Sequence, residues 1–78
     1  MPVHAYILVQ TEVGRAAGVT EQAQSIEGVT EAHEVMGSYD VIIKATVEQL
    51  DQLGPTVVHK VQAIQGITRT ITCPVTHT

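Results

Sequence analysis

The sequence lacks the residues on which several protein classes depend. It contains no Trp, no Phe, two Tyr and a single Cys among 78 residues. One cysteine excludes a disulfide within the chain, and a lone thiol without a signal peptide is typical of a reducing cytoplasm. Apolar runs such as 41–43 are far too short to span a bilayer. The sequence therefore predicts a cytoplasmic protein without a membrane segment, whose core consists of Val, Ile, Leu and Ala.

Basic residues are equally scarce. The fixed cations are Arg15, Lys44, Lys60 and Arg69, they are scattered along the chain, and the formal net charge is −4. Direct binding of DNA or RNA needs clustered Lys and Arg against the phosphates, and two tyrosines are too few for a base-stacking platform. The composition thus argues against a nucleic acid as a direct partner.

The sequence gives no indication of a metal or of another cofactor. Its four histidines are His4, His33, His59 and His77. They show no close pairing at helical spacing, and His33 with Glu31 on one strand face supplies two ligands where zinc takes three or four. We interpret the histidines as solvated surface residues and Cys73 as a small buried apolar residue.

Hydrophobic periodicity predicts the order strand, helix, strand, strand, helix, strand. The predicted strands are 3–9, 29–36, 39–45 and 67–75, and the predicted helices are 15–27 and 46–65. Gly37-Ser38 suits a two-residue hairpin turn between the middle strands. Residues 46–49 have the form of a capping box, and Gly54-Pro55 predicts a kink or a break in the second helix. Pro74 suits the end of the last strand or an edge position.

The two halves of the chain echo each other, because 26–30 (IEGVT) recurs as 64–68 (IQGIT). Each half is a strand, a helix and a strand. Two such halves form the ferredoxin-like βαββαβ arrangement of the α+β class, a four-stranded antiparallel sheet with both helices on one face. The first and third strands are the most apolar, which places them at the centre. We expect residues 1–78 to form a single domain, which at this length is marginally stable without a partner.

The sheet face turned away from the helices carries surplus apolar surface. We expect it to hold Tyr6, Leu8, Ala32, Met36 and Ile42. Such a patch exceeds what a monomer normally exposes, and burying about 400 Å2 would contribute roughly 10 kcal/mol before the costs of association. The sequence predicts a homodimer in which these residues meet their copies across a two-fold axis.

Residues 35–45 (VMGSYDVIIKA) resemble the Gly-x-x-Asp hairpin of the leucine-responsive regulator and asparagine-regulator (Lrp/AsnC) family. Residues 26–29 and 64–72 resemble the helix-to-strand junctions of that family. The resemblance runs from about residue 3 to residue 75, over the effector-sensing and oligomerisation domain that is often called the RAM domain. It implies dimers closed into an α/β barrel, which associate further into rings, commonly of eight subunits, with an amino-acid effector between neighbouring dimers.

Full-length members of the family also carry an N-terminal helix-turn-helix. Because Met1 directly precedes the first predicted strand, we expect a stand-alone sensing domain. Such a domain could self-assemble, or co-assemble with full-length regulators and alter their DNA binding indirectly.

The resemblance also implies which residues bind the effector. They are Gly37, Ser38, Tyr39, Asp40, Thr70 and Thr72. The hairpin amides would face the carboxylate of the amino acid, Asp40 its ammonium group, and the threonines would approach from a neighbouring dimer. A zwitterion needs donors at one end and a carboxylate at the other. Residue chemistry alone also fits a plain turn and a threonine ladder on a half-exposed edge strand.

Three functions stay open at this point. The first is a non-catalytic, amino-acid-responsive module of the Lrp/AsnC type. The second is a small enzyme, since dimeric α/β barrels of this strand order include monooxygenases and isomerases; yet no nucleophile and base stand at a recognisable spacing, so no catalytic residue is assigned. The third is a ligand-free oligomerisation domain, which the sequence does not separate from the first.

Overall fold

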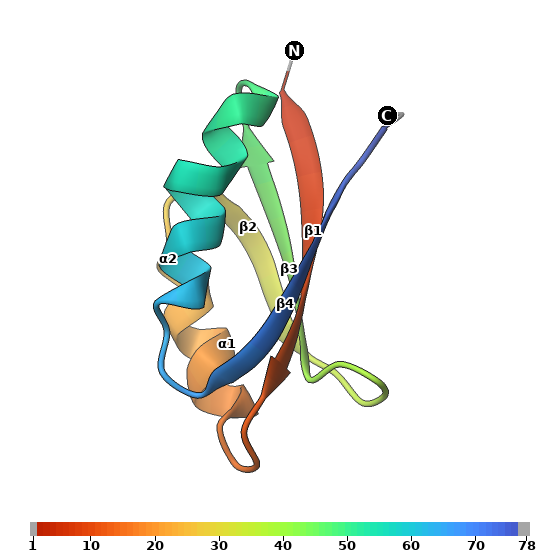
Figure 1. Cartoon of the computed structure of the whole chain (residues 1–78), viewed down its shortest axis with the longest axis vertical. Helices are drawn as coiled ribbons and strands as arrows, with labels where there is room; N and C mark the ends of the chain where they lie inside the picture. The colour runs from red at the N-terminus through yellow and green to blue at the C-terminus, as the bar shows by residue number, and fades with distance from the viewer. Residues whose placement is uncertain (1, 77–78) are drawn as a thin grey trace.

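The computed structural model describes residues 2–76, which form one four-stranded antiparallel sheet covered by helices on one face (Figure 1). The elements are β1 (Val3–Thr11), α1 (Ala16–Gln24), β2 (Val29–Glu34), β3 (Val41–Val47), η1 (Leu50–Gln52), η2 (Gly54–Val58), α2 (His59–Gln62) and β4 (Ile67–Pro74). The strand order is β2-β3-β1-β4, so β1 and β3 are central. The ferredoxin-like βαββαβ fold predicted from the sequence is confirmed.

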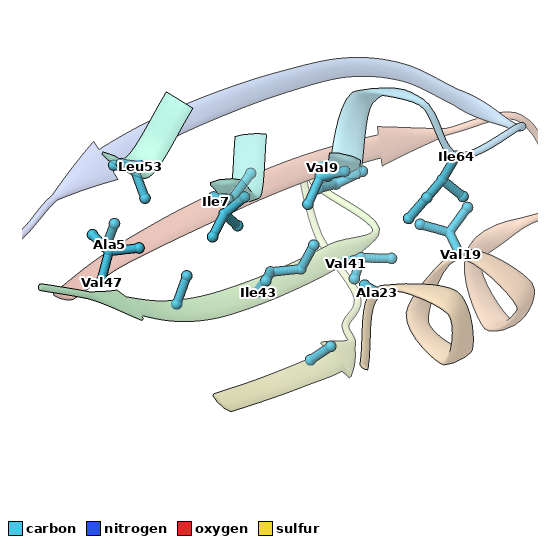
Figure 2. Packing of buried hydrophobic residues seen from close by; sticks show 14 residues of the cluster. Ala5, Ile7, Val9, Val19, Ala23, Val41, Ile43, Val47, Leu53 and Ile64 are labelled. Atoms are coloured by element: carbon cyan, nitrogen blue, oxygen red, sulfur yellow. The ribbon is translucent and has the colours of Figure 1, made fainter. Parts of the chain in front are cut away.

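The core fills the space between the sheet and the helices (Figure 2). Alternate residues of the two central strands point into it, and the remaining ones point to the other face. Its largest fully buried side chains are Ile7, Val9, Val19, Ile43, Val41, Val57 and Val61. Short β-branched side chains fit a pleated surface, so this core forms without any large aromatic residue. No helix among residues 2–76 is long and apolar enough to cross a membrane.

The second helical segment is irregular at Gly54-Pro55, as predicted. A 3₁₀ turn at Leu50–Gln52 leads into a π-helical turn at Gly54–Val58 and then into α2. Proline has no N–H to donate and its ring clashes with the preceding turn, so the regular ladder is interrupted there. Pro74 ends β4, which is an edge strand, and this prediction is confirmed as well.

The predicted capping box at residues 46–49 is wrong. Thr46 lies within β3, where its N–H donates to the carbonyl of Gly28 at 2.8 Å and its hydroxyl is hydrogen-bonded to His4 Nδ1 at 2.9 Å. The helical segment begins at Leu50, and its N-cap is Gln49, whose N–H donates to Oε1 of Gln52 at 3.1 Å. Pairing between strands outweighs the local capping motif because it satisfies the same backbone groups.

The connection between β2 and β3 is longer than the predicted two-residue turn. Residues 35–40 form a loop, which the N–H of Val35 closes by donating to the carbonyl of Asp40 at 2.9 Å. Gly37 within the loop has φ +143°, a conformation that side chains rarely adopt. The N–H of Asp40 donates to the carbonyl of Val9 of β1 at 2.8 Å, so Asp40 is bonded to both neighbouring strands.

The predicted positions of Ala32 and Met36 on the open face are wrong. The β2–β3 register shifts between Val29 and Glu31, which turns the following residues to the opposite face. Ala32 therefore pairs with Ile43 and is buried in the core, with 4% of its surface exposed. Met36 lies beyond the end of β2, fully exposed in the loop.

The predicted burial of Cys73 is also wrong. Cys73 is exposed because it lies on the edge strand β4, opposite Tyr6. Tyr6 is itself 41% exposed on the face that the helices leave open. The thiol and the tyrosine ring thus share that face.

Candidate functional site

The loop of residues 35–40 is fastened to the end of the central strand β1. The N–H of Asp40 donates to the carbonyl of Val9 at 2.8 Å, and its Oδ2 accepts from the N–H of Thr11 at 2.8 Å. Nε2 of Gln10 donates to the carbonyl of Ser38 at 2.9 Å. These contacts hold the loop at one place even though three of its residues, Met36, Gly37 and Ser38, are exposed.

The geometry leaves Asp40 able to bind a cation. Its Oδ2 is occupied by Thr11, whereas Oδ1 has no hydrogen-bond partner among residues 2–76. The carboxylate is half-buried, so an ammonium group at Oδ1 would be less screened than on an open surface. The four predicted loop residues, Gly37 to Asp40, are contiguous in the chain and stand at this one site. Sequence reasoning missed Gln10 and Thr11, for which no motif gives a signal.

The two predicted threonines lie elsewhere in the chain. Thr70 and Thr72 belong to β4, in register with Val9 and Ile7, and therefore lie toward the helix-covered side. Thr70 Oγ1 accepts a hydrogen bond of 3.1 Å from Nε2 of Gln62. Because β1 lies between β4 and β3, the hydroxyls of Thr70 and Thr72 do not come together with the loop of the same chain.

A hollow of about 350 Å3 lies between the end of α2 and the start of β4. Its lining residues are Gln62, Ile67, Thr68, Arg69 and Thr70. All of these residues but Ile67 are polar, and Thr70, in register with Val9, faces the helix side of the sheet, whereas Arg69, in register with Gln10, faces the open side. Gln62 and Arg69 were not among the residues predicted from sequence, because only the tertiary fold brings α2 beside β4.

The open face of the sheet carries an apolar row across three strands. Leu8 of β1 lies in register with Ile42 of β3 on one side and with Ile71 of β4 on the other. Tyr6 follows on the same face of β1. Tyr6, Leu8 and Ile42 thus stand on the predicted face, and Ile71 joins them because the register of β4 turns it that way.

One border of the open face is charged. Nε2 of His33 lies 3.1 Å from Oε1 of Glu31, and Nζ of Lys44 lies 4.0 Å from Oε2. The hydrogen bond from His33, helped by the charge of Lys44, lowers the pKa of Glu31 below its usual value. Within residues 2–76 no three His, Cys, Asp or Glu side chains gather as a metal site would require. His77 lies outside the described residues.

A βαββαβ sheet with one open apolar face and a glycine-containing loop fixed to its central strand defines a small α+β domain of the ferredoxin-like class. The family model of the Lrp/AsnC ligand binding domain matches residues 4–78, and the chain belongs to this family. The resemblance inferred from the hairpin and the junctions is thereby confirmed.

Individual relatives agree with this assignment. Over 54 residues the chain is 35% identical to an uncharacterised helix-turn-helix-type transcriptional regulator of Pyrococcus furiosus; the match covers 69% of this chain but 36% of that regulator. The solved structure of FFRP-DM1 has a TM-score of 0.85 at 32% identity and covers 94% of this chain and 97% of its own. The structure of E. coli AsnC has a TM-score of 0.87 at 26% identity, over 97% of this chain and 52% of its own.

Proposed function

We propose that this domain binds a small amino-acid effector, self-associates, and serves a transcription regulator of the Lrp/AsnC type without catalysing a reaction. The observation that carries the proposal is the anchoring of the 35–40 loop to β1 by main-chain and side-chain hydrogen bonds. A loop that is held before the ligand arrives loses little entropy on binding, so its contacts contribute more to affinity.

The assigned roles follow the charges of a zwitterion. The free oxygen of Asp40 would accept from the ammonium group, and the backbone amides of Gly37, Ser38 and Tyr39 would donate to the carboxylate. Thr70 and Thr72, which one chain does not bring to the loop, would be contributed by a neighbouring dimer. The effector would then connect two dimers.

Self-association is supported by the open face. Helices cover the other side of the sheet, so the row Ile42, Leu8 and Ile71 stands uncovered beside Tyr6. A second copy packed face to face would bury it and close a dimeric α/β barrel, and further contacts between dimers would form a ring. The open face alone also fits a ligand-free oligomerisation domain, which the experiment below must separate from a sensor.

The experiment is calorimetric titration and thermal shift of the purified chain with each of the twenty amino acids. A ligand that binds only the native form raises the free energy of unfolding by RT ln(1 + [L]/Kd), so millimolar binding is detectable. We expect at least one amino acid to bind, and Asp40→Asn to weaken it about tenfold or more because the ammonium loses its counter-charge.

Asp51→Asn is the matched control, since it removes the same charge at an exposed position on η1. Assembly without a thermal shift from any amino acid would leave the ligand-free oligomerisation domain as the function. Equal loss of affinity in both variants would remove Asp40 from the site.

A further inference from the structure

We infer that formation of the dimer fixes the tip of the 35–40 loop, residues 37–39, and that Gln10 is the positioning residue that couples the two. The inference rests on the proposed function and adds its regulation. The part of the site that would bind the carboxylate of the effector is complete only in the dimer. This follows from two anchors of the loop that differ in their exposure to water.

The first anchor lies at the base of the loop and needs no partner. The N–H of Asp40 donates to the carbonyl of Val9, and its Oδ2 accepts from the N–H of Thr11, both at 2.8 Å. Val9 is fully buried, and the bond to Thr11 is partly buried. Water competes little for such bonds, so they keep most of their strength. Asp40, which would bind the ammonium group, is therefore in place in a single chain.

The second anchor holds the tip of the loop and is exposed. Nε2 of Gln10 donates to the carbonyl of Ser38 at 2.9 Å, and this contact is open to solvent. Among residues 2–76 it is the one hydrogen bond that reaches the tip. Gly37 and Ser38 are themselves exposed, so no packing replaces the bond when water displaces it. In a single chain the tip is thus held more weakly than the base.

Gln10 lies on the open face of the sheet, where a second copy would pack. Side chains alternate along β1, so Gln10 points the same way as Leu8 and Tyr6, and its ladder partner Arg69 shares that face. Gln10 follows Leu8 by two residues, about 7 Å along the strand. A standard interface buries about 800 Å2 of each partner, far more than a row of three side chains supplies. A copy that covers Leu8 therefore covers Gln10 as well.

Burial by the second copy strengthens the anchor at the tip. Water no longer competes for the amide of Gln10, and its hydrogen bond to Ser38 is stronger in the lower dielectric. The main-chain amides of residues 37–39 are then fixed before the effector arrives and lose little entropy when it binds. The affinity for the effector rises with dimerisation, and by linkage the effector stabilises the dimer by the same factor.

The test measures the mobility of the loop by time-resolved fluorescence anisotropy, with a dye on the thiol of Met36→Cys in a Cys73→Ser chain. Met36 is fully exposed, so the dye replaces no contact. Val13→Cys carries the reference dye, because Val13 is equally exposed in the connection between β1 and α1. Dilution takes the chain from dimer to monomer, which sedimentation with fluorescence detection records.

The nanosecond motion of the dye at position 36 should have an amplitude about twofold smaller in the dimer than in the monomer, which is the difference between a rigid and a flexible backbone. The dye at position 13 should move equally in both. Because no ligand is added, the measurement reports on the loop itself.

Gln10→Met separates the anchor from the dimer. It removes the donor at a similar side-chain length and leaves an apolar side chain on the open face, so the dimer should persist while the tip stays mobile in it. Gln24→Met is the matched control, since Nε2 of Gln24 donates to the carbonyl of Ala32 at 3.2 Å, between α1 and β2. This variant should fix the tip on dimerisation as the unaltered chain does.

Two results would overturn the inference and leave the proposed function standing. One is equal mobility of the dye at position 36 in monomer and dimer. The other is an equal effect of Gln10→Met and Gln24→Met, which would remove Gln10 from the coupling. A chain that stays monomeric at every concentration would overturn the inference together with the proposed self-association.

Discussion

Oδ2 of Asp40 accepts a hydrogen bond of 2.8 Å from the main-chain N–H of Thr11. The contact joins the residue before β3 to the last residue of β1. The N–H of Asp40 donates at the same time to the carbonyl of Val9, so one residue satisfies two main-chain groups of the central strand. Asp40 therefore holds the loop in place whatever it binds.

This double role predicts how substitutions of Asp40 affect stability. Asp40→Ala should lower the free energy of unfolding by about 1–2 kcal/mol, because the half-buried N–H of Thr11 loses its acceptor. Asp40→Asn retains an amide oxygen for that N–H and should cost less. Urea unfolding of both variants measures the difference. If the two variants lose equal stability, the charge of Asp40, rather than its hydrogen bond to Thr11, stabilises the fold.

The open face predicts the effect of a charge on assembly. Leu8→Glu places a carboxylate between Ile42 and Ile71, where a second copy would have to desolvate it. Sedimentation should then show a folded monomer at concentrations where we expect the unaltered chain to be a dimer. Val13→Glu adds the same charge at a fully exposed loop residue and should leave the dimer intact. A dimer that persists in Leu8→Glu would refute the interface.

Two glycines predict a graded loss of stability. Gly28 has φ +97°, and a Cβ there would lie 3.0 Å from Cγ2 of Val57, whereas Gly14 has φ +83° and open space around it. Gly14→Ala should cost about 1 kcal/mol through its backbone conformation, and Gly28→Ala about 2–3 kcal/mol because crowding against the core adds to it. Thermal unfolding of both variants tests the order, and a reversed order would contradict it.

The lowered pKa of Glu31 predicts that the stability of the fold depends on pH. Its pKa in the folded chain lies below its usual value, mainly because of the hydrogen bond from His33. A depressed pKa means that the contribution of the ionised carboxylate to stability is present above the unfolded-state pKa. It is lost as the pH falls through the folded-state pKa. An NMR titration of the Glu31 carboxyl should report this low pKa.

The matched variants for this titration are His33→Ala and His59→Ala. His33→Ala removes the hydrogen bond and should raise the pKa of Glu31 toward the usual value of a glutamate. His59 lies on α2, on the other side of the sheet, and its removal should change nothing. An unshifted pKa in His33→Ala would assign the effect to Lys44.

The sequence by itself determined the order of the elements, the central position of β1 and β3, and the irregularity at Gly54-Pro55. These follow from local causes, namely apolar periodicity, glycine and proline. The family hairpin was recognisable for the same reason, since its residues are contiguous. The single-domain extent of 1–78, the stand-alone state and the cytoplasmic location stay predictions.

Only the tertiary structure decided which way Ala32 and Cys73 face, that Thr46 belongs to a strand, and that Gln10 and Thr11 hold the loop. Each depends on pairing between segments far apart in the chain. One extra residue between Val29 and Glu31 in β2 reverses the faces of all that follow, and no local pattern encodes it. The hollow that Gln62 and Thr70 help to line arises in the same way, because α2 and β4 meet only when the sheet is assembled.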